Sequence, residues 1–287
     1  MTTELLTLGP VHLEVTDLRR SSEFWQDVIG LQLRHDTADA VELGTGDHTL
    51  VVLHGGAMSP VLQGYSGLYH IAIHPATPAE FGRLLVRLIR RRQPMSPVDH
   101  LMSKAIYLND PDGIQIEITL ETPSRMLDSV VEGRKLFAIG VDGSRHSASE
   151  PLDLDDILMA IPEGSEDALI ADDTKVGHLH LHVGDLEAAH SFYKTLGFIP
   201  NKYRPTLGGA DLGAGGAFAH RIAINTWQGA NAPQAPAGSA RMRHFTVLFQ
   251  SPAQLEAAAR AVAAERFEHG YAVKDPSGNR IVLANSI

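Results

Sequence analysis

Residues 178–197 read HLHLHVGDLEAAHSFYKTLG, and this stretch decides the fold. It has the pattern of an alternating strand, an aspartate cap and an amphipathic helix that ends at glycine. Residues 11–30, VHLEVTDLRRSSEFWQDVIG, repeat that order closely, and shorter copies begin at residues 68–74 and 242–248. One small unit therefore occurs four times, and such repetition must be recognised before a fold is assigned.

The second and fourth copies show how each unit ends. Predicted helices cover residues 78–91 and 252–264, and each copy later reaches a similar turn, DPDG at 110–113 and DPSG at 275–278. Proline pre-sets such a turn and glycine closes it. Each unit is therefore a strand, a helix and about three strands. The sequence predicts an α+β fold of four βαβββ modules.

A segment rich in Gly, Ser and Asp interrupts this repetition between the second and third modules. It runs over residues 125–174 and contains one short amphipathic piece at 152–161. Domain boundaries fall in stretches of this kind. We therefore expect a first region at 1–124, a linker at 125–174 and a second region at 175–287.

Bulk composition excludes several classes of protein. The 287 residues are 44% hydrophobic and carry a formal net charge of -10, which disfavours nucleic acid as a partner. Cysteine is absent, so thiolate metal sites and disulfides are excluded. No signal-peptide pattern and no run of about 18 apolar residues occurs, so we expect a cytoplasmic protein without a membrane partner.

The fourfold pattern resembles the vicinal oxygen chelate superfamily, which includes glyoxalases, bleomycin resistance proteins and type I extradiol dioxygenases. The resemblance covers roughly residues 8–122 and 175–286, and within the superfamily the chain looks most like the catechol 2,3-dioxygenases. It implies that the modules pair to form two cup-shaped half-barrel domains.

The resemblance also implies a metal-binding histidine on the first strand of a module, seven residues before the helix cap. His178 lies seven residues before Asp185, and His70 lies seven before Thr77. Glu117 is the expected third ligand, because a carboxylate that faces inward on an alternating strand needs a partner. Two histidines and one carboxylate are the ligand set of non-haem Fe(II) oxygenases, although the same donors accept Mn(II).

The other two modules fit this ligand pattern poorly. His12 is displaced by two positions along its strand, and is expected to be a core or rim histidine. His244 is correctly placed, but Val282 stands where the second module has Glu117. The second and third modules should therefore share one cup that holds the metal. The first and fourth should form a second, metal-free cup.

Three further residues are expected to act on the substrate. His100 and Tyr107 resemble a family segment that places an imidazole and a phenol beside a bound diol, although strand packing accounts for Tyr107 about equally well on pattern alone. His220 begins the last strand of the third module, where extradiol dioxygenases carry a proton-shuttling histidine. His180 and His182 share a strand face with His178 and are interpreted as supporting residues.

The sequence thus indicates an Fe(II)-dependent extradiol dioxygenase of aromatic catabolism, with a catechol and O2 as substrates. Two alternatives remain open. One is a metal-dependent isomerase or lyase of the glyoxalase type, and the other is a non-enzymatic protein that binds a small molecule. The sequence specifies neither the catechol nor the oligomeric state, and it is compatible with a homo-oligomer.

Overall fold

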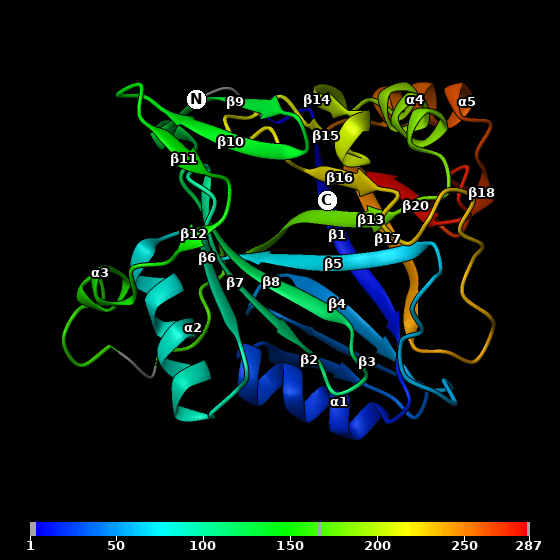
Figure 1. The fold of residues 1–287 in the computed structure, drawn as a ribbon. Helices are drawn as coiled ribbons and strands as arrows, with labels where there is room; N and C mark the ends of the chain where they lie inside the picture. The colour runs from blue at the N-terminus through cyan, green and yellow to red at the C-terminus, as the bar shows by residue number, and fades with distance from the viewer. Residues whose placement is uncertain (1–3, 166–167, 286–287) are drawn as a thin grey trace.

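The structure is a computed structural model that describes residues 4–165 and 168–285 (Figure 1). All four modules have the expected order of one strand, one helix and three strands. The first comprises β1 (Leu6–Glu14), α1 (Leu18–Phe24) with its π-helical continuation η1 (Trp25–Ile29), β2 (Gln32–Asp36), β3 (Ala40–Gly44) and β4 (Thr49–His54). The second comprises β5 (Gly67–His74), α2 (Pro78–Arg90), β6 (Ser96–Asp99), β7 (Ser103–Asn109) and β8 (Gln115–Glu121). The third comprises β13 (Lys175–His182), α4 (Leu186–Leu196), β14 (Ile199–Arg204), η3 (Pro205–Leu207), β15 (Gly209–Gly213) and β16 (Ile222–Asn225). The fourth comprises β17 (Arg241–Phe249), α5 (Pro252–Ala261), β18 (Glu265–Phe267), β19 (Gly270–Lys274) and β20 (Arg280–Asn285).

The pairing of modules is confirmed. One sheet has the order β12-β6-β7-β8-β5-β13-β16-β15-β14, so it joins the second module to the third through the antiparallel pair β5/β13. The other has the order β18-β19-β20-β17-β1-β4-β3-β2, and it joins the fourth module to the first through β17/β1. We call the first sheet the His70 cup and the second the His12 cup.

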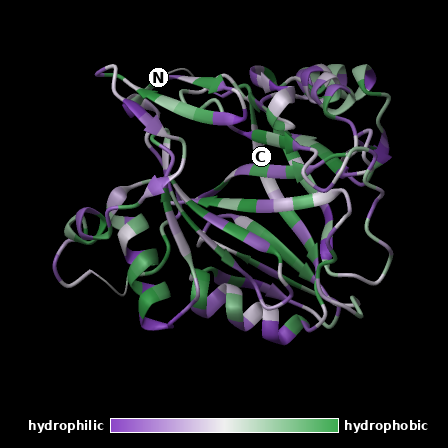
Figure 2. Ribbon diagram, viewed as in Figure 1, coloured by the Kyte–Doolittle hydropathy of each residue, from purple (hydrophilic) through white to green (hydrophobic). Residues whose placement is uncertain are grey.

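The helices lie at the periphery of the molecule and the sheets lie between them (Figure 1). Asp17, Thr77 and Asp185 each cap a helix by accepting a backbone N–H, as their positions in the repeat predict. Alternation of polar and apolar residues is visible along the strands in Figure 2, as expected when the two faces of a sheet meet different surroundings. Apolar side chains of all four modules form one continuous core.

The segment between the second and third modules has its own structure. After η2 (Pro123–Arg125) it forms a small sheet of β9 (Met126–Glu132), β10 (Lys135–Gly140) and β11 (Arg145–Ser147). β12 (Glu150–Pro151) then pairs with β6, and α3 (Leu154–Met159) lies within the amphipathic piece predicted at 152–161. Lys202 of β14 meets Asp128 of β9 at 2.6 Å. The segment therefore contacts both edges of the His70 cup, through β6 at one edge and β14 at the other. The limits of the regions, 1–124, 125–174 and 175–287, stay a prediction.

None of the helices in the described part of the chain combines the length and apolar character needed to cross a bilayer.

Candidate metal centre

Sheet register brings the three predicted ligands to one point. Ala72 on β5 is flanked by Glu117 on β8 and by His178 on β13. His70 lies two residues before Ala72, and alternate residues of a strand point to the same face. All three donors therefore project from one face of the sheet, and the small side chain of Ala72 leaves space between them.

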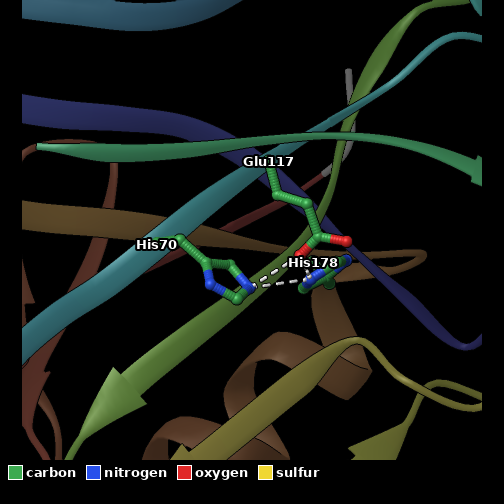
Figure 3. A group of neighbouring side chains, drawn as sticks. All are labelled: His70, Glu117 and His178. Carbon is green, nitrogen blue, oxygen red and sulfur yellow. Dashed lines mark hydrogen bonds and ion pairs between the residues drawn. The ribbon is translucent and has the colours of Figure 1, made fainter. Parts of the chain in front are cut away.

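The donor atoms nearly touch, as Figure 3 shows. His70 Nε2 lies 2.9 Å from Glu117 Oε2 and 3.1 Å from His178 Nε2, and the third separation, His178 Nε2 to Glu117 Oε2, is 3.2 Å. The three side chains are almost fully buried. No other histidine or acidic side chain among residues 4–165 and 168–285 joins this group.

This arrangement fits a divalent cation. Burial holds the pKa of His178 well below its ordinary value, because a charged ring would lose its hydration there. Neutral His178 and the Glu117 carboxylate then direct lone pairs at one point, which is unfavourable unless a cation occupies it. Donors about 2.1 Å from an ion and at right angles to one another lie about 3 Å apart, close to the spacing in this group.

His100 and Tyr107 lie together beside the group. His100 donates from Nδ1 to the carbonyl of Ala148, at 2.6 Å, so its Nε2 accepts the Tyr107 hydroxyl at 2.9 Å. The centroid of the Tyr107 ring lies 5.6 Å from that of the His70 ring. Burial and the nearby Glu117 carboxylate raise the pKa of Tyr107 well above its usual value, so the side chain stays a phenol.

His220 also lies at the group, with its ring centroid 4.9 Å from that of His178. Its Nδ1 lies 2.9 Å from Oδ2 of Asp211, a buried carboxylate on β15 that the sequence analysis did not identify. Burial alone would raise the pKa of Asp211, but the hydrogen bonds from His220 and Asn201 and the charge of Arg204 together lower it. Asp211 therefore accepts from Nδ1–H of His220 and leaves Nε2 as a base.

His180 and Tyr69 also border the space beside the three donors. Asn225 Nδ2 donates to His180 Nε2 at 2.8 Å, so His180 carries its proton on Nδ1. Tyr69 forms a β-bulge, because His180 pairs with His70 while Leu181 pairs with Leu68. The bulge turns Tyr69 to within 4.9 Å of the His70 and His180 rings, measured between ring centroids.

A cavity of about 410 Å³ adjoins these rings. Tyr69 and His182 line it, with the amides of Gln63, Gln115 and Gln228. This volume is within the range of small-molecule sites. Strand alternation in the sequence indicated His182 as a supporting residue, whereas the bulge that turns Tyr69 inward has no signature in the sequence.

The His12 cup holds three histidines at the corresponding strands. His12 lies between His54 and His244, with stacked rings whose centroids are 5.2 Å and 3.9 Å away. Nδ1 of His12 lies 2.9 Å from Nε2 of His54, but among the described residues no third histidine or carboxylate donor joins this pair. Val282 is on the neighbouring β20, so no carboxylate takes the place that Glu117 has in the His70 cup.

Comparisons with known proteins agree with this architecture. A family model described as the Glyoxalase/Bleomycin resistance protein/Dioxygenase superfamily matches residues 7–118 and 175–283. A catechol-2,3-dioxygenase of Bacillus subtilis (strain 168) is 32% identical over 282 residues, which cover 94% of this chain and 93% of that protein.

Solved structures share the fold at lower identity. Glyoxalase I from Zea mays has a TM-score of 0.57 and 17% identity, covering 98% of this chain and 92% of the maize protein. A Bacillus subtilis subsp. subtilis strain 168 protein, assigned only provisionally as a dioxygenase, has a TM-score of 0.61 and 12% identity. The match covers 99% of this chain and 87% of that one.

Proposed function

Because this chain belongs to the glyoxalase/bleomycin resistance protein/dioxygenase superfamily, we propose that it is an extradiol dioxygenase that uses Fe(II) to cleave a catechol with O2. The group formed by His70, Glu117 and His178 carries this proposal. Three protein donors leave coordination positions for a substrate and for O2, which is the arrangement of non-haem Fe(II) oxygenases. The relative named as a catechol-2,3-dioxygenase supports the choice of substrate.

The donor set favours this chemistry over the glyoxalase alternative. Glyoxalases commonly add a fourth protein ligand, and among the described residues no further histidine or carboxylate places a donor atom within 4.8 Å of all three. Glu117 contributes one negative charge, so a divalent ion there keeps about one positive charge. A catechol monoanion neutralises that charge when it binds through both oxygens.

Iron, when bound, supplies the redox chemistry that couples a catechol to O2. His220 accepts the proton of a substrate hydroxyl at Nε2, because Asp211 holds the other ring proton on Nδ1. Tyr107, positioned by His100, directs its hydroxyl oxygen at the bound diol and stays protonated. Neutral His180 presents Nδ1–H to the same space.

The overall reaction is balanced with no further reductant. One carbon-carbon bond next to the two hydroxyls breaks, both atoms of O2 enter the product, and a hydroxymuconic semialdehyde results. The proton that His220 removes returns to the product. The adjoining cavity, with its amide side chains and Tyr69, would hold ring substituents.

The test separates metal binding from proton transfer. Wild-type protein, His70→Ala and His220→Ala are loaded anaerobically with Fe(II), iron content is measured, and catechol in air is added while the yellow ring-fission product is monitored. We expect His70→Ala to lose both iron and turnover. His220→Ala should keep its iron and lose about 10² to 10⁴ in turnover, the usual contribution of a general acid or base.

Iron-loaded wild-type protein that forms no ring-fission product from any of a panel of catechols would contradict the proposal. Turnover by His220→Ala at the wild-type rate would remove His220 from the mechanism.

A further inference from the structure

His74 lies directly behind one of the three donors. Its Nε2 is 2.8 Å from Nδ1 of His178, the nitrogen that faces away from His70 and Glu117. The two rings are nearly perpendicular, with centroids 5.0 Å apart, and His74 is 1% exposed. A buried imidazole therefore contacts the outer nitrogen of His178.

Gly177 makes room for that imidazole. A side chain at this position would place its Cβ 2.0 Å from Cγ of His74, closer than any real contact. Val176 pairs with Ile73 and His178 pairs with Ala72, so Gly177 is the extra residue of a bulge. The bulge also turns His178 to the face of the donors. Any larger residue at 177 would displace the His74 ring.

A carboxylate determines which nitrogen of His74 carries the proton. Glu121 Oε1 lies 2.9 Å from Nδ1 of His74 and accepts from Nη1 of Arg221 at 2.6 Å. Nη1 of Arg221 also donates to the carbonyl of Gly177 at 2.9 Å, and Nε donates to Glu4 at 2.7 Å. Arg221 therefore holds both Glu121 and the bulge in place.

The directions of these bonds follow from one another. An ionised carboxylate only accepts, so Nδ1 of His74 carries the proton and Nε2 is an acceptor. Nδ1 of His178 must then donate to it, and the lone pair of His178 is left on Nε2, toward His70 and Glu117. By contrast, His70 Nδ1 has no partner in the described structure. Only one of the two histidine donors is oriented in this way.

We propose that His74, Glu121 and Gly177 are positioning residues that hold His178 in the orientation and tautomer required of a metal ligand. This inference rests on the proposed function, since it assigns a purpose to the orientation of His178. Outer partners of metal-binding histidines typically change metal affinity by about 10-fold to 100-fold.

The first experiment measures Co(II) affinity of the full-length protein by its visible ligand-field absorption. His74→Phe keeps the ring volume but cannot accept from His178, so we expect affinity to fall about 10-fold to 100-fold. His74→Gln retains an acceptor and should restore most of the loss. The matched control is His12→Phe, at a half-buried histidine that is hydrogen-bonded to His54 in the His12 cup, and it should bind Co(II) as the wild type does.

Gly177→Ala and Glu121→Gln change the other two proposed positioning residues. Both should weaken Co(II) binding, and Glu121→Gln keeps the shape of the site if Gly177→Ala does not fold. Nitrogen-15 NMR of the metal-free wild type should show His178 protonated on Nδ1, and His74→Phe should lose that preference. A merely structural role for His74 would not change the tautomer of His178.

Wild-type Co(II) affinity in folded His74→Phe, or a wild-type His178 protonated on Nε2, would overturn the inference. Failure of the proposed function looks different, because wild-type protein would then bind no metal, or would bind iron without cleaving catechols.

Discussion

Histidine occurs in both cups, but its neighbours differ. In the His70 cup, Glu117 completes a set of converging donors. In the His12 cup the rings stack, and burial lowers the pKa of His12 to about 3 and that of His244 to about 4. These rings are neutral near pH 7, because desolvation disfavours their charged form. The same residue type thus serves as a candidate ligand in one cup and as stacked packing in the other.

The titration of His12 yields a prediction at the scale of one residue. Its folded pKa of about 3 is below the ordinary histidine pKa of 6.5, so the unfolded chain binds a proton first as the pH falls. Stability from the neutral ring is complete above the unfolded pKa and is lost as the pH falls toward the folded one. The urea midpoint of His12→Gln should therefore decrease less than that of the wild type between about pH 7 and about pH 5. His269→Gln, at an exposed histidine, should retain the wild-type slope, and an unchanged slope in His12→Gln would disprove the assignment.

Among the elements, two turns add contacts between successive modules. Asp112, in the turn between β7 and β8, accepts from the backbone N–H of Thr16 at 2.7 Å and pairs with Arg20 of α1. In the second half, Asp275 of the corresponding turn accepts the hydroxyl of Tyr193 from α4 at 2.9 Å. Each turn therefore attaches the even-numbered module to the helix region of the odd-numbered module before it.

This attachment predicts the effect of Asp112→Ala. Asp112 is 1% exposed, and removal of its carboxylate leaves the backbone N–H and the hydroxyl of half-buried Thr16 without this acceptor. The expected loss is about 1 to 3 kcal/mol in the free energy of unfolding, measured by urea titration. Asp47→Ala, at an exposed aspartate, is the control. Equal midpoints for the two variants would show that the contact contributes nothing to stability.

For the whole molecule, the proposed centre joins segments that are distant in the chain. His70 and Glu117 come from the first half and His178 from the second, across the pair β5/β13. The same pair connects the two modules of the His70 cup. A bound ion would thus hold both halves together, and its binding energy would add to the stability of the whole fold.

Added metal should accordingly raise the unfolding midpoint. Mn(II), which avoids oxidation in air, should stabilise the wild type with the logarithm of its concentration above the dissociation constant, by about 2.7 kcal/mol at 100 times that constant. Glu117→Ala should show no such shift, because the two remaining donors bind weakly. The measurement is thermal or urea unfolding over a series of Mn(II) concentrations, and an equal shift in both proteins would place the ion elsewhere.

The sequence by itself predicted the four modules and their helix caps, because these depend on local periodicity and on repetition. The positions of the expected ligands within the repeat predicted which modules pair. The sequence also identified the residues that meet at the candidate centre. The groups that support these residues became visible only in the folded structure: Asp211 beside His220, the backbone carbonyl of Ala148 beside His100, and His74 packed against Gly177. These contacts depend on strand register and on bulges, and one extra residue in a strand redirects every side chain after it.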